Sequence, residues 1–238
     1  IDWIIDFKWS SFVGGFMIAK KIDNLLSIIR KTVLSCNREL SDINLLGVSK
    51  KKPIEMIIEA FDSGLFDIGE NYVEEFSEKY ATYHPEGLNY HFIGRLPTKK
   101  VRKVVGKVVL IHSVDSIKLA KKIDFVASEV DVCQDILIQV NQGSELSKSG
   151  ADLDSLENLF SETIELKNIR LKGLMSIPPF HESAKPYFSQ LRKLRDDFQE
   201  KFEIELPFLS MGMSGDFQDA IKEGSTHIRI GTSIFGQR

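Results

Sequence analysis

The sequence alternates between short apolar runs and longer segments with helical periodicity, and this alternation restricts the possible folds more than any other feature. The apolar runs are interpreted as strands, at residues 45–50, 65–69, 90–94, 108–112, 135–141, 171–177, 207–211 and 227–230. Strands that alternate with helices form parallel sheets. Eight such units within 238 residues predict a single closed (β/α)8 barrel of the TIM type, in the α/β class, rather than an open doubly wound sheet. No G-x-G-x-x-G motif follows the first strand, which argues against a dinucleotide-binding domain.

Two regions precede the first strand. Residues 18–39 carry apolar side chains at spacings of three and four, which predicts an N-terminal helix. Residues 1–16 are apolar and aromatic, but charged residues interrupt them, so they match neither a membrane span nor a signal peptide. We expect residues 1–16 to be a poorly ordered N-terminal extension and residues 17–238 to form one barrel domain. The alternative is a packed segment that covers one end of the domain.

Composition and charge exclude several classes of partner. The formal net charge is −3, so no overall field attracts nucleic acid or an anionic membrane surface. A basic stretch at residues 99–107 is interpreted as the solvated face of a short helix. The two cysteines, Cys36 and Cys133, have no disulfide-framework or metal-ligand spacing. This usage predicts a reducing, cytoplasmic location and no metal site.

A lysine ends the first predicted strand. Lys50 follows a buried apolar run, and Pro53 stands where the first turn of the next helix would begin. Active sites of parallel α/β folds form at the carboxyl ends of strands, so Lys50 is a candidate for chemistry. The alternative is that Lys50, Lys51 and Lys52 are solvated loop charges.

Two loops near the carboxyl end are candidates for a phosphate cup. Ser210 to Ser214 follow the seventh strand, and Gly231, Thr232 and Ser233 follow the eighth. Barrels frequently bind phosphate with these two loops, although glycine and serine also make ordinary turns. A lysine that faces a phosphate cup suggests a phosphorylated carbonyl cofactor such as pyridoxal phosphate, because lysine amines form Schiff bases with carbonyls. A cofactor-free barrel enzyme such as a phosphate-sugar isomerase is the alternative.

Several ordered motifs carry a resemblance to a known family. They are Leu46-Gly47-Val48-Ser49-Lys50-Lys51-Lys52-Pro53, Gly69-Glu70-Asn71-Tyr72-Val73-Glu74-Glu75, His91-Phe92-Ile93-Gly94-Arg95-Leu96, His112-Ser113-Val114-Asp115-Ser116, Lys148-Ser149-Gly150, Gly173-Leu174-Met175-Ser176-Ile177-Pro178, Leu209-Ser210-Met211-Gly212-Met213-Ser214 and Arg229-Ile230-Gly231-Thr232-Ser233-Ile234-Phe235-Gly236. From about Ile18 to its carboxyl end, the chain resembles the pyridoxal phosphate homeostasis protein family (YggS/PROSC type).

The resemblance implies a fold and a set of cofactor contacts. The fold would be the fold-type-III barrel of pyridoxal phosphate proteins, similar to the N-terminal domain of alanine racemase. Pyridoxal 5'-phosphate would be bound as a Schiff base, an internal aldimine, on Lys50, with Lys51 and Lys52 solvated. The residues that the resemblance assigns to the phosphate cup are Ser210, Ser214, Gly231 and Thr232.

The resemblance also implies which residues surround the cofactor ring. Arg229 matches the arginine that faces the pyridine nitrogen, and Asn71 and His91 match positions beside the ring. His91 could equally be a hydrogen-bonded interior histidine. In two places the chain departs from the family pattern: residues 97–100 are Pro-Thr-Lys-Lys where Gln, a small polar residue, Asn and Lys are usual, and Gly215 replaces an acidic residue.

The resemblance points to holding the cofactor rather than to turnover. A cation beside the ring nitrogen keeps that nitrogen unprotonated, which makes the cofactor a poorer electron sink. The racemases complete their site with a second domain and a tyrosine, and this chain ends at Arg238, so we expect no such domain and no established catalytic activity. The expected role is a monomer in cofactor homeostasis that delivers the cofactor to apoenzymes. The alternative is a pyridoxal phosphate-dependent enzyme similar to amino-acid racemases.

Overall fold

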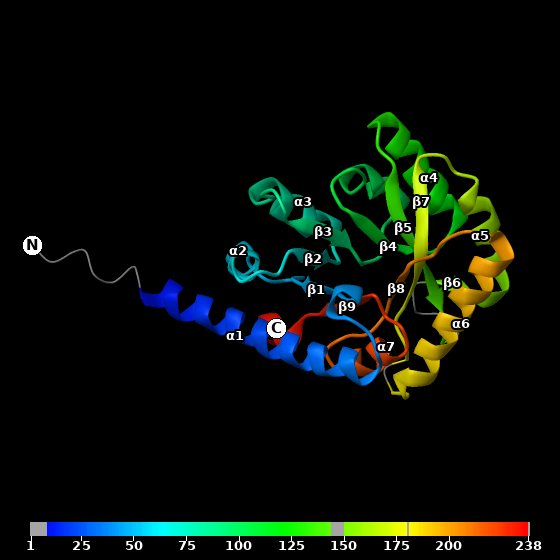
Figure 1. Ribbon diagram of the computed structural model, residues 1–238. Helices are drawn as coiled ribbons and strands as arrows, with labels where there is room; N and C mark the ends of the chain where they lie inside the picture. Colours follow the sequence, from blue (N-terminus) through cyan, green and yellow to red (C-terminus); the bar gives the residue numbers. More distant parts are fainter. Residues whose placement is uncertain (1–8, 144–149, 180, 238) are drawn as a thin grey trace, which may run out of the picture.

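The computed structural model describes residues 9–143, 150–179 and 181–237, with side chains from residue 17 onward. Its centre is a closed barrel of parallel strands, in which β1 pairs with both β2 and β9 and β4 pairs with β5 (Figure 1). The barrel strands are β1 (Asn44–Val48), β2 (Asp67–Glu70), β3 (Asn89–Phe92), β4 (Leu110–Val114), β5 (Gln134–Asn141), β7 (Ile169–Ser176), β8 (Phe208–Ser210) and β9 (His227–Ile230). The predicted (β/α)8 barrel is confirmed.

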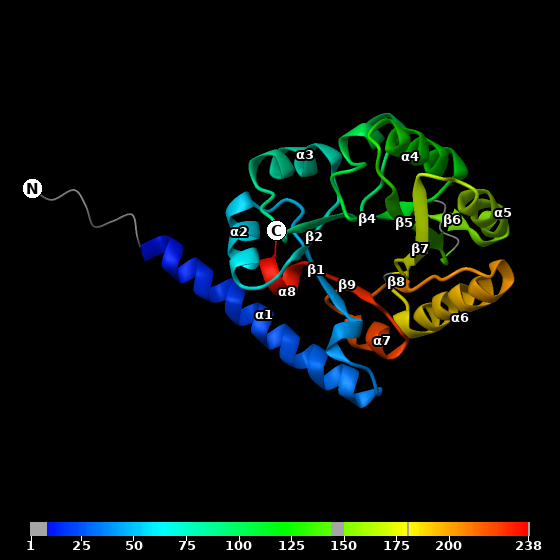
Figure 2. The ribbon, with the colours of Figure 1, turned by 45° about the horizontal axis from the view of Figure 1, so that its top comes forward.

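Helices surround the barrel (Figure 2). They are α2 (Ile54–Asp62), α3 (Val73–Thr82), α4 (Ile117–Glu129), α5 (Leu153–Ile164), α6 (Ala184–Phe202), α7 (Phe217–Lys222) and α8 (Thr232–Phe235). The short basic helix predicted after the third strand is a 3-10 helix, η2 (Thr98–Lys103). Three short elements were not predicted: η1 (Leu40–Asp42), β6 (Ala151–Asp152) and α8. Each has four residues or fewer, too few to show a period.

The N-terminal helix α1 (Trp9–Ser35) lies along the outside of the barrel. Its buried side chains repeat every three or four residues and include Ile22, Leu25 and Ile29, and the helix contacts α2, α7 and α8. It ends earlier than predicted because Asn37 takes a left-handed backbone conformation, with φ of 54°. Residues 9–16 of the expected extension are helical, and residues 1–8 lie outside the described residues. The expectation of poor order there stays a prediction.

The barrel interior is unusually polar. Apolar side chains such as Leu46, Val48 and Ile93 fill one part of it. In such barrels the layers are usually made of bulky branched residues. Here buried polar side chains also point into the interior, namely His91, His112, Ser210, His227 and Arg229. This polar interior lies directly beneath the carboxyl ends of the strands and forms the floor of the candidate site.

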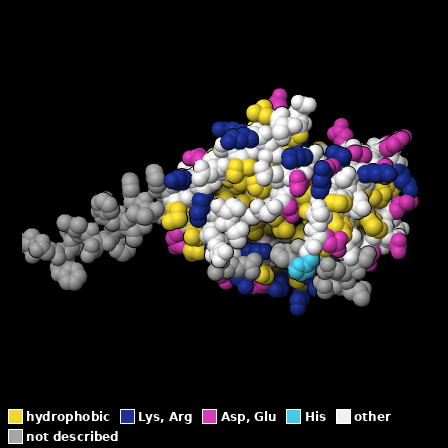
Figure 3. Space-filling view, turned by 90° about the horizontal axis from the view of Figure 1, so that it is seen from below, with side chains coloured by type: hydrophobic (Ala, Val, Ile, Leu, Met, Phe, Trp, Pro, Cys, Tyr) yellow, Lys and Arg dark blue, Asp and Glu magenta, His cyan; other side chains and the backbone are white. Residues whose placement is uncertain are grey.

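The outer surface carries charges of both signs. Basic and acidic side chains are interspersed over the described part of the face shown in Figure 3. Within the described residues, every helix is too short or too polar to cross a bilayer.

Candidate functional site

The lysine triplet sits at the carboxyl end of β1, as predicted. Leu46 and Val48 pack with Ile93 inside the barrel, and side chains alternate along a strand, so the same alternation places Lys50 on the interior side. Lys50 is partly buried. The turn at Lys51, with φ of 59°, then directs the chain outward.

Lys51 and Lys52 are held at the surface. The backbone N–H of Lys51 donates to Glu75 Oε1 at 2.5 Å, and Lys52 Nζ donates to the backbone oxygen of Gln237 at 2.8 Å. The ammonium of Lys51 also lies 6.0 Å from the centre of the Tyr72 ring. The structure therefore separates Lys50 from the two lysines that follow it.

A buried ion-pair network fixes the backbone on which Lys50 stands. Lys79 of α3 donates to the backbone oxygen of Ser49 at 2.8 Å, to Glu70 Oε1 at 2.6 Å and to Glu75 Oε1 at 2.7 Å. The Ser49 hydroxyl donates to the same Glu70 oxygen at 2.5 Å. Burial raises the pKa of Glu70, and the ammonium of Lys79 opposes that shift. This network was not predicted from the sequence, because Lys79 follows the ordinary pattern of an exposed helix residue.

The Arg229 guanidinium is buried beneath the strand ends, with 4% of the residue exposed. Its Nη1 donates to Ser210 Oγ at 2.6 Å, and its Nη2 donates to the backbone oxygen of Ser176 at 3.0 Å. Burial lowers the pKa of Arg229 to about 10, and the nearby Asp216 carboxylate acts in the opposite direction. The guanidinium therefore stays charged at neutral pH.

Two of the four residues assigned to the phosphate cup meet in the structure. The Thr232 hydroxyl donates to Ser214 Oγ at 3.2 Å, which joins the loops after β8 and β9. Gly231 immediately precedes α8 and forms its N-cap. Ser210 lies deeper, and its hydroxyl is hydrogen-bonded to Arg229 and to His112 instead. The structure thus joins Ser214 to Thr232, which follows Gly231 directly, and it groups Ser210 with Arg229.

Glycine and a carboxylate shape the loop after β8. Gly212 has φ of +94°, and a Cβ there would lie 2.5 Å from Ala220 Cβ, so no larger residue fits. Asp216 Oδ1 accepts from the backbone N–H of Met213 at 2.6 Å and holds the turn together. Burial raises the pKa of Asp216. The acidic residue usual at position 215 is absent, but Asp216 supplies a carboxylate one residue later.

Asn71 follows β2 and has an unsatisfied polar atom. Its Oδ1 is buried and has no hydrogen-bond partner among the described residues. The backbone of Asn71 is fixed by Gly94, because a Cβ at position 94 would lie 2.0 Å from the Asn71 backbone oxygen. A buried acceptor without a partner is costly unless a ligand or water supplies a donor.

His91 belongs to a chain of buried side chains, which we call the buried relay: Asp67, His91, His112, Ser210 and Arg229. His91 Nε2 lies 2.9 Å from Asp67 Oδ1, and His91 Nδ1 lies 3.0 Å from His112 Nε2. His112 Nδ1 lies 2.8 Å from Ser210 Oγ. Both ring nitrogens of His91 are thus engaged within the barrel, which corresponds to the second role considered from the sequence. Its contact with a cofactor stays a prediction.

A third histidine, His227, lies beside the buried relay but has other partners. Its ring centre is 5.7 Å from that of His112 and 6.1 Å from that of His91. Its nitrogens lie 2.9 Å from Thr226 Oγ1 and 3.3 Å from Asn44 Nδ2. Burial lowers the pKa of His227 to about 3 and the pKa of His112 well below its usual value. Within the described residues, no three or more His, Cys, Asp or Glu side chains are arranged to hold a metal.

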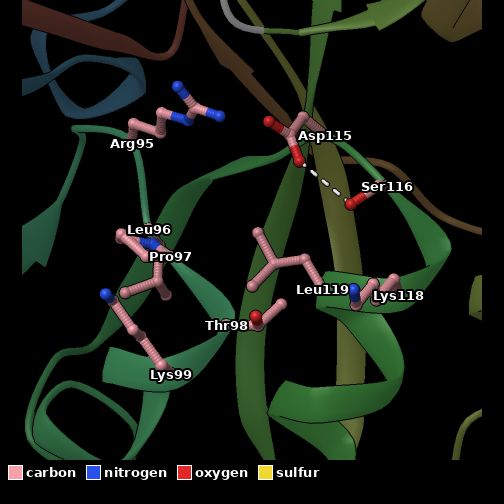
Figure 4. Close-up of a pocket in the computed structure, with 9 residues that line it drawn as sticks. All are labelled: Arg95, Leu96, Pro97, Thr98, Lys99, Asp115, Ser116, Lys118 and Leu119. Carbon is pink, nitrogen blue, oxygen red and sulfur yellow. Dashed lines mark hydrogen bonds between the residues drawn. The ribbon is translucent and has the colours of Figure 1, made fainter.

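A cavity of about 460 Å³ opens at the carboxyl ends of β3 and β4 (Figure 4). Arg95, Lys99 and Lys118 are among its lining residues, together with Asp115 and Ser116 of the turn before α4. The cavity includes Pro97, Thr98 and Lys99, so it is lined in part by the segment that departs from the family pattern. None of the residues predicted for the cofactor site lines this cavity.

The contribution of Asp67 and His227 to the interior was not predicted from the sequence. A signal was present, because polar residues at every second position of an otherwise apolar strand point to one face of the sheet. The two-residue alternation shows which face of a strand a side chain is on, but it does not show which residues of different strands meet across the barrel interior. The contact of His112 with Ser210, for example, joins residues 98 positions apart.

Comparison with known proteins gives a consistent assignment. Residues 68–238 match the family model of the alanine racemase N-terminal domain. A pyridoxal phosphate homeostasis protein from Aquifex aeolicus (strain VF5) is 46% identical over 222 residues, which cover 92% of this chain and 97% of that protein. Since the match spans nearly the whole of both proteins, it concerns the complete barrel.

Solved structures agree with the sequence matches. PipY of Synechococcus elongatus PCC7942, solved with pyridoxal phosphate bound, has a TM-score of 0.82 and 34% identity, and the match covers 92% of this chain and 100% of PipY. Alanine racemase from Corynebacterium glutamicum has a TM-score of 0.72 at 15% identity, covering 94% of this chain and 61% of the racemase. At that identity the racemase shows a shared fold alone. The chain belongs to the pyridoxal phosphate homeostasis protein family and has the fold of the alanine racemase N-terminal domain.

Proposed function

We propose that this protein binds pyridoxal 5'-phosphate at the carboxyl end of the barrel, covalently through Lys50, and holds it for use in cofactor homeostasis. The observation that supports the proposal is that Lys50 after β1, the buried Arg229 on β9 and the joined hydroxyls of Ser214 and Thr232 lie at or beneath the carboxyl ends of the barrel strands. The Aquifex aeolicus relative is named a pyridoxal phosphate homeostasis protein, and PipY was solved with pyridoxal phosphate bound.

The residues present fit the cofactor. The neighbouring hydroxyls of Ser214 and Thr232 can turn their hydrogens toward a bound phosphate in place of the bond between them, and a charged Arg229 can face the ring nitrogen. The unpartnered Oδ1 of Asn71 can accept a hydrogen bond from a bound ligand. When bound, pyridoxal phosphate supplies an electrophilic carbonyl that an amine can carry.

The residues of the chain favour retention of the cofactor over turnover. Arg229 keeps its charge in the interior, and a cation there disfavours protonation of the ring nitrogen. The network of Lys79 and Glu70 holds the backbone at Ser49, so the position of Lys50 is set by the α3 side of the barrel. The Arg229 charge and the Lys79–Glu70 network thus serve to bind and orient the cofactor, and neither moves a proton onto a substrate.

The absorbance spectrum tests the proposal. Wild-type protein loaded with pyridoxal phosphate should show the band of a lysine-linked cofactor, and borohydride should fix that cofactor to residue 50. Lys50→Ala should abolish the band and the fixation. Lys51→Ala is the matched control, because Lys51 is the adjacent exposed lysine, and it should keep both. A colourless wild-type protein, or an unchanged band in Lys50→Ala, contradicts the proposal.

We also propose a cytoplasmic, monomeric carrier that passes the cofactor to apoenzymes. Protein loaded with pyridoxal phosphate should activate a pyridoxal phosphate-dependent apoenzyme even when a scavenger removes free cofactor. The same concentration of free cofactor, added with the scavenger, should activate the apoenzyme more slowly. Size-exclusion chromatography with light scattering should give the mass of one chain. Activation that the scavenger suppresses completely would argue against direct delivery.

An enzyme similar to amino-acid racemases is the second candidate, favoured by the match to the alanine racemase N-terminal domain. Incubation of loaded protein with single L-amino acids, followed by chiral analysis, separates the two candidates. We expect no accumulation of D-enantiomer beyond the amount of protein present. Sustained turnover would establish the enzyme instead of the carrier.

A further inference from the structure

The buried relay connects Arg229 to the opposite side of the barrel interior. It runs from Asp67 on β2 through His91 on β3 and His112 on β4, then crosses to Ser210 on β8 and Arg229 on β9. Each link lies between 2.6 and 3.0 Å. Four of the five residues are at most 4% exposed, and the Asp67 side chain is 26% exposed. The resemblance places His91 beside the cofactor ring as well, but the hydrogen bonds within the buried relay are contacts of the protein with itself.

The chemistry of the two ends gives the chain a direction. A carboxylate only accepts, so Nε2–H of His91 donates to Asp67, and the Nδ1 of a neutral His91 then accepts from Nε2–H of His112. A neutral His112 has its Nδ1 free to accept from the Ser210 hydroxyl. The Ser210 oxygen in turn accepts from Arg229, which only donates. Each hydrogen bond of the buried relay is therefore donated in the same direction, from the Arg229 cation toward the Asp67 carboxylate.

We propose that Ser210, His112, His91 and Asp67 are positioning residues for Arg229, which hold its guanidinium in one orientation and so set how it meets the ring nitrogen of the cofactor. The inference rests on the proposed function for the identity of the ligand. The arrangement of the guanidinium itself depends only on contacts within the protein. Because the Ser210 hydroxyl donates its hydrogen to His112, its oxygen lone pairs point in a fixed direction. Arg229 Nη1 can therefore donate to Ser210 in one orientation only.

His227 provides a matched control for this proposal. It is a histidine of the same barrel interior, 3% exposed, in ring contact with both relay histidines, and it bonds to Thr226 and Asn44 instead. His112→Phe and His227→Phe therefore make the same chemical change at similar burial, but only the first cuts the buried relay. If the histidines merely fill space, the two variants should behave alike.

The first measurement uses protein without cofactor. Nitrogen-15 NMR of the histidine rings should find His91 and His112 each as one tautomer, protonated on Nε2. Exchange of the Arg229 guanidinium protons with solvent should accelerate about tenfold or more in His112→Phe, the factor that corresponds to loss of one strong hydrogen-bond link, and should be unchanged in His227→Phe. Equal exchange rates in the two variants, or the opposite tautomers, would overturn the proposal.

The second measurement uses protein loaded with pyridoxal phosphate. The band of the lysine-linked cofactor, followed against pH, should change its midpoint in His112→Phe and keep the wild-type midpoint in His227→Phe. If wild-type protein forms no such band, the proposed function fails and the NMR measurement still decides the inference. If the band forms and both variants match wild type in both measurements, the inference fails and the proposed function stands.

Asp67→Asn keeps the inference testable if His112→Phe does not fold, because Asp67 is the partly exposed end of the buried relay. An asparagine amide can donate as well as accept, so it no longer fixes the direction. A second tautomer should appear at His91 and His112 in the variant. Rings that keep one tautomer together with wild-type exchange at Arg229 would overturn the proposal.

Discussion

At the scale of single residues, one turn gives three consecutive lysines three different environments. Lys50 continues the interior side of β1, whereas Lys51 and Lys52 make contacts with Glu75, Tyr72 and Gln237 at the surface. The composition of the triplet cannot show this difference. The backbone at Lys51, with φ of 59°, produces it.

The threonine of the phosphate cup can be tested by an isosteric change. Thr232→Val removes the hydroxyl that meets Ser214 and keeps the shape. Pyridoxal phosphate affinity should fall by about tenfold or more, the effect of one lost hydrogen bond to a charged group. Equilibrium binding measured by absorbance gives the affinity. Thr82→Val is the control, because its hydroxyl only donates to the Glu78 backbone oxygen on α3, and it should bind like wild type.

The ion pair of Lys79 and Glu70 should matter far more than an exposed pair. Lys79→Met leaves the buried Glu70 carboxylate without its cation, which should lower the free energy of unfolding by about 3 kcal/mol. Lys100→Met removes the lysine of an exposed pair with Glu74 and should change it by less than about 0.5 kcal/mol. Urea unfolding measures both. Equal losses would show that burial does not distinguish the two pairs.

At the scale of elements, α1 depends on one apolar stripe against the barrel. Ile29 lies fully buried on this stripe, and Leu34 on the same helix is 74% exposed. Ile29→Ala should lower the free energy of unfolding by about 2–4 kcal/mol, because it leaves a cavity under the helix. Leu34→Ala should change it by less than about 0.5 kcal/mol. Chemical denaturation compares the two, and similar losses would mean that α1 does not dock through this stripe.

The elements were predictable wherever a period extends over enough residues. The strands predicted at residues 135–141 and 227–230 correspond to β5 (Gln134–Asn141) and β9 (His227–Ile230) within one residue at each end. The two-residue β6 and the four-residue α8 are too short to carry a period. The candidate site was predictable through strand ends and family motifs. The buried relay was not, because its links join strands that are distant in sequence.

At the scale of the whole molecule, the buried histidines make stability depend on pH. Burial holds the pKa of His227 at about 3, below the value near 6.5 that an unfolded chain gives it. Between these values the unfolded chain binds a proton that the folded protein does not. The contribution of His227 is therefore complete above about pH 6.5 and is lost as the pH falls toward 3, by up to about 1.4 kcal/mol per pH unit.

Urea unfolding at a series of pH values tests this dependence. The free energy of unfolding of wild type should fall steeply between about pH 6.5 and pH 4. His227→Phe should be less stable at neutral pH and show a shallower slope. His84→Gln is the control, because His84 is exposed on the outer surface, and it should keep the wild-type slope. Parallel slopes in wild type and His227→Phe would contradict the assignment.

The path of the buried relay also bears on the order in which a ribosome-bound chain can complete its fold. Asp67, His91 and His112 belong to the first half of the barrel, and Ser210 and Arg229 to the last two strands. A nascent chain that has emerged only as far as β4 holds an imidazole whose hydroxyl partner is 98 residues away. In the half-barrel, the buried relay therefore lacks its Ser210 and Arg229 end, and water must hydrogen-bond to the His112 ring in their place. Closure of the interior waits for β8 and β9, so the cofactor pocket becomes available only after β9 has been synthesised.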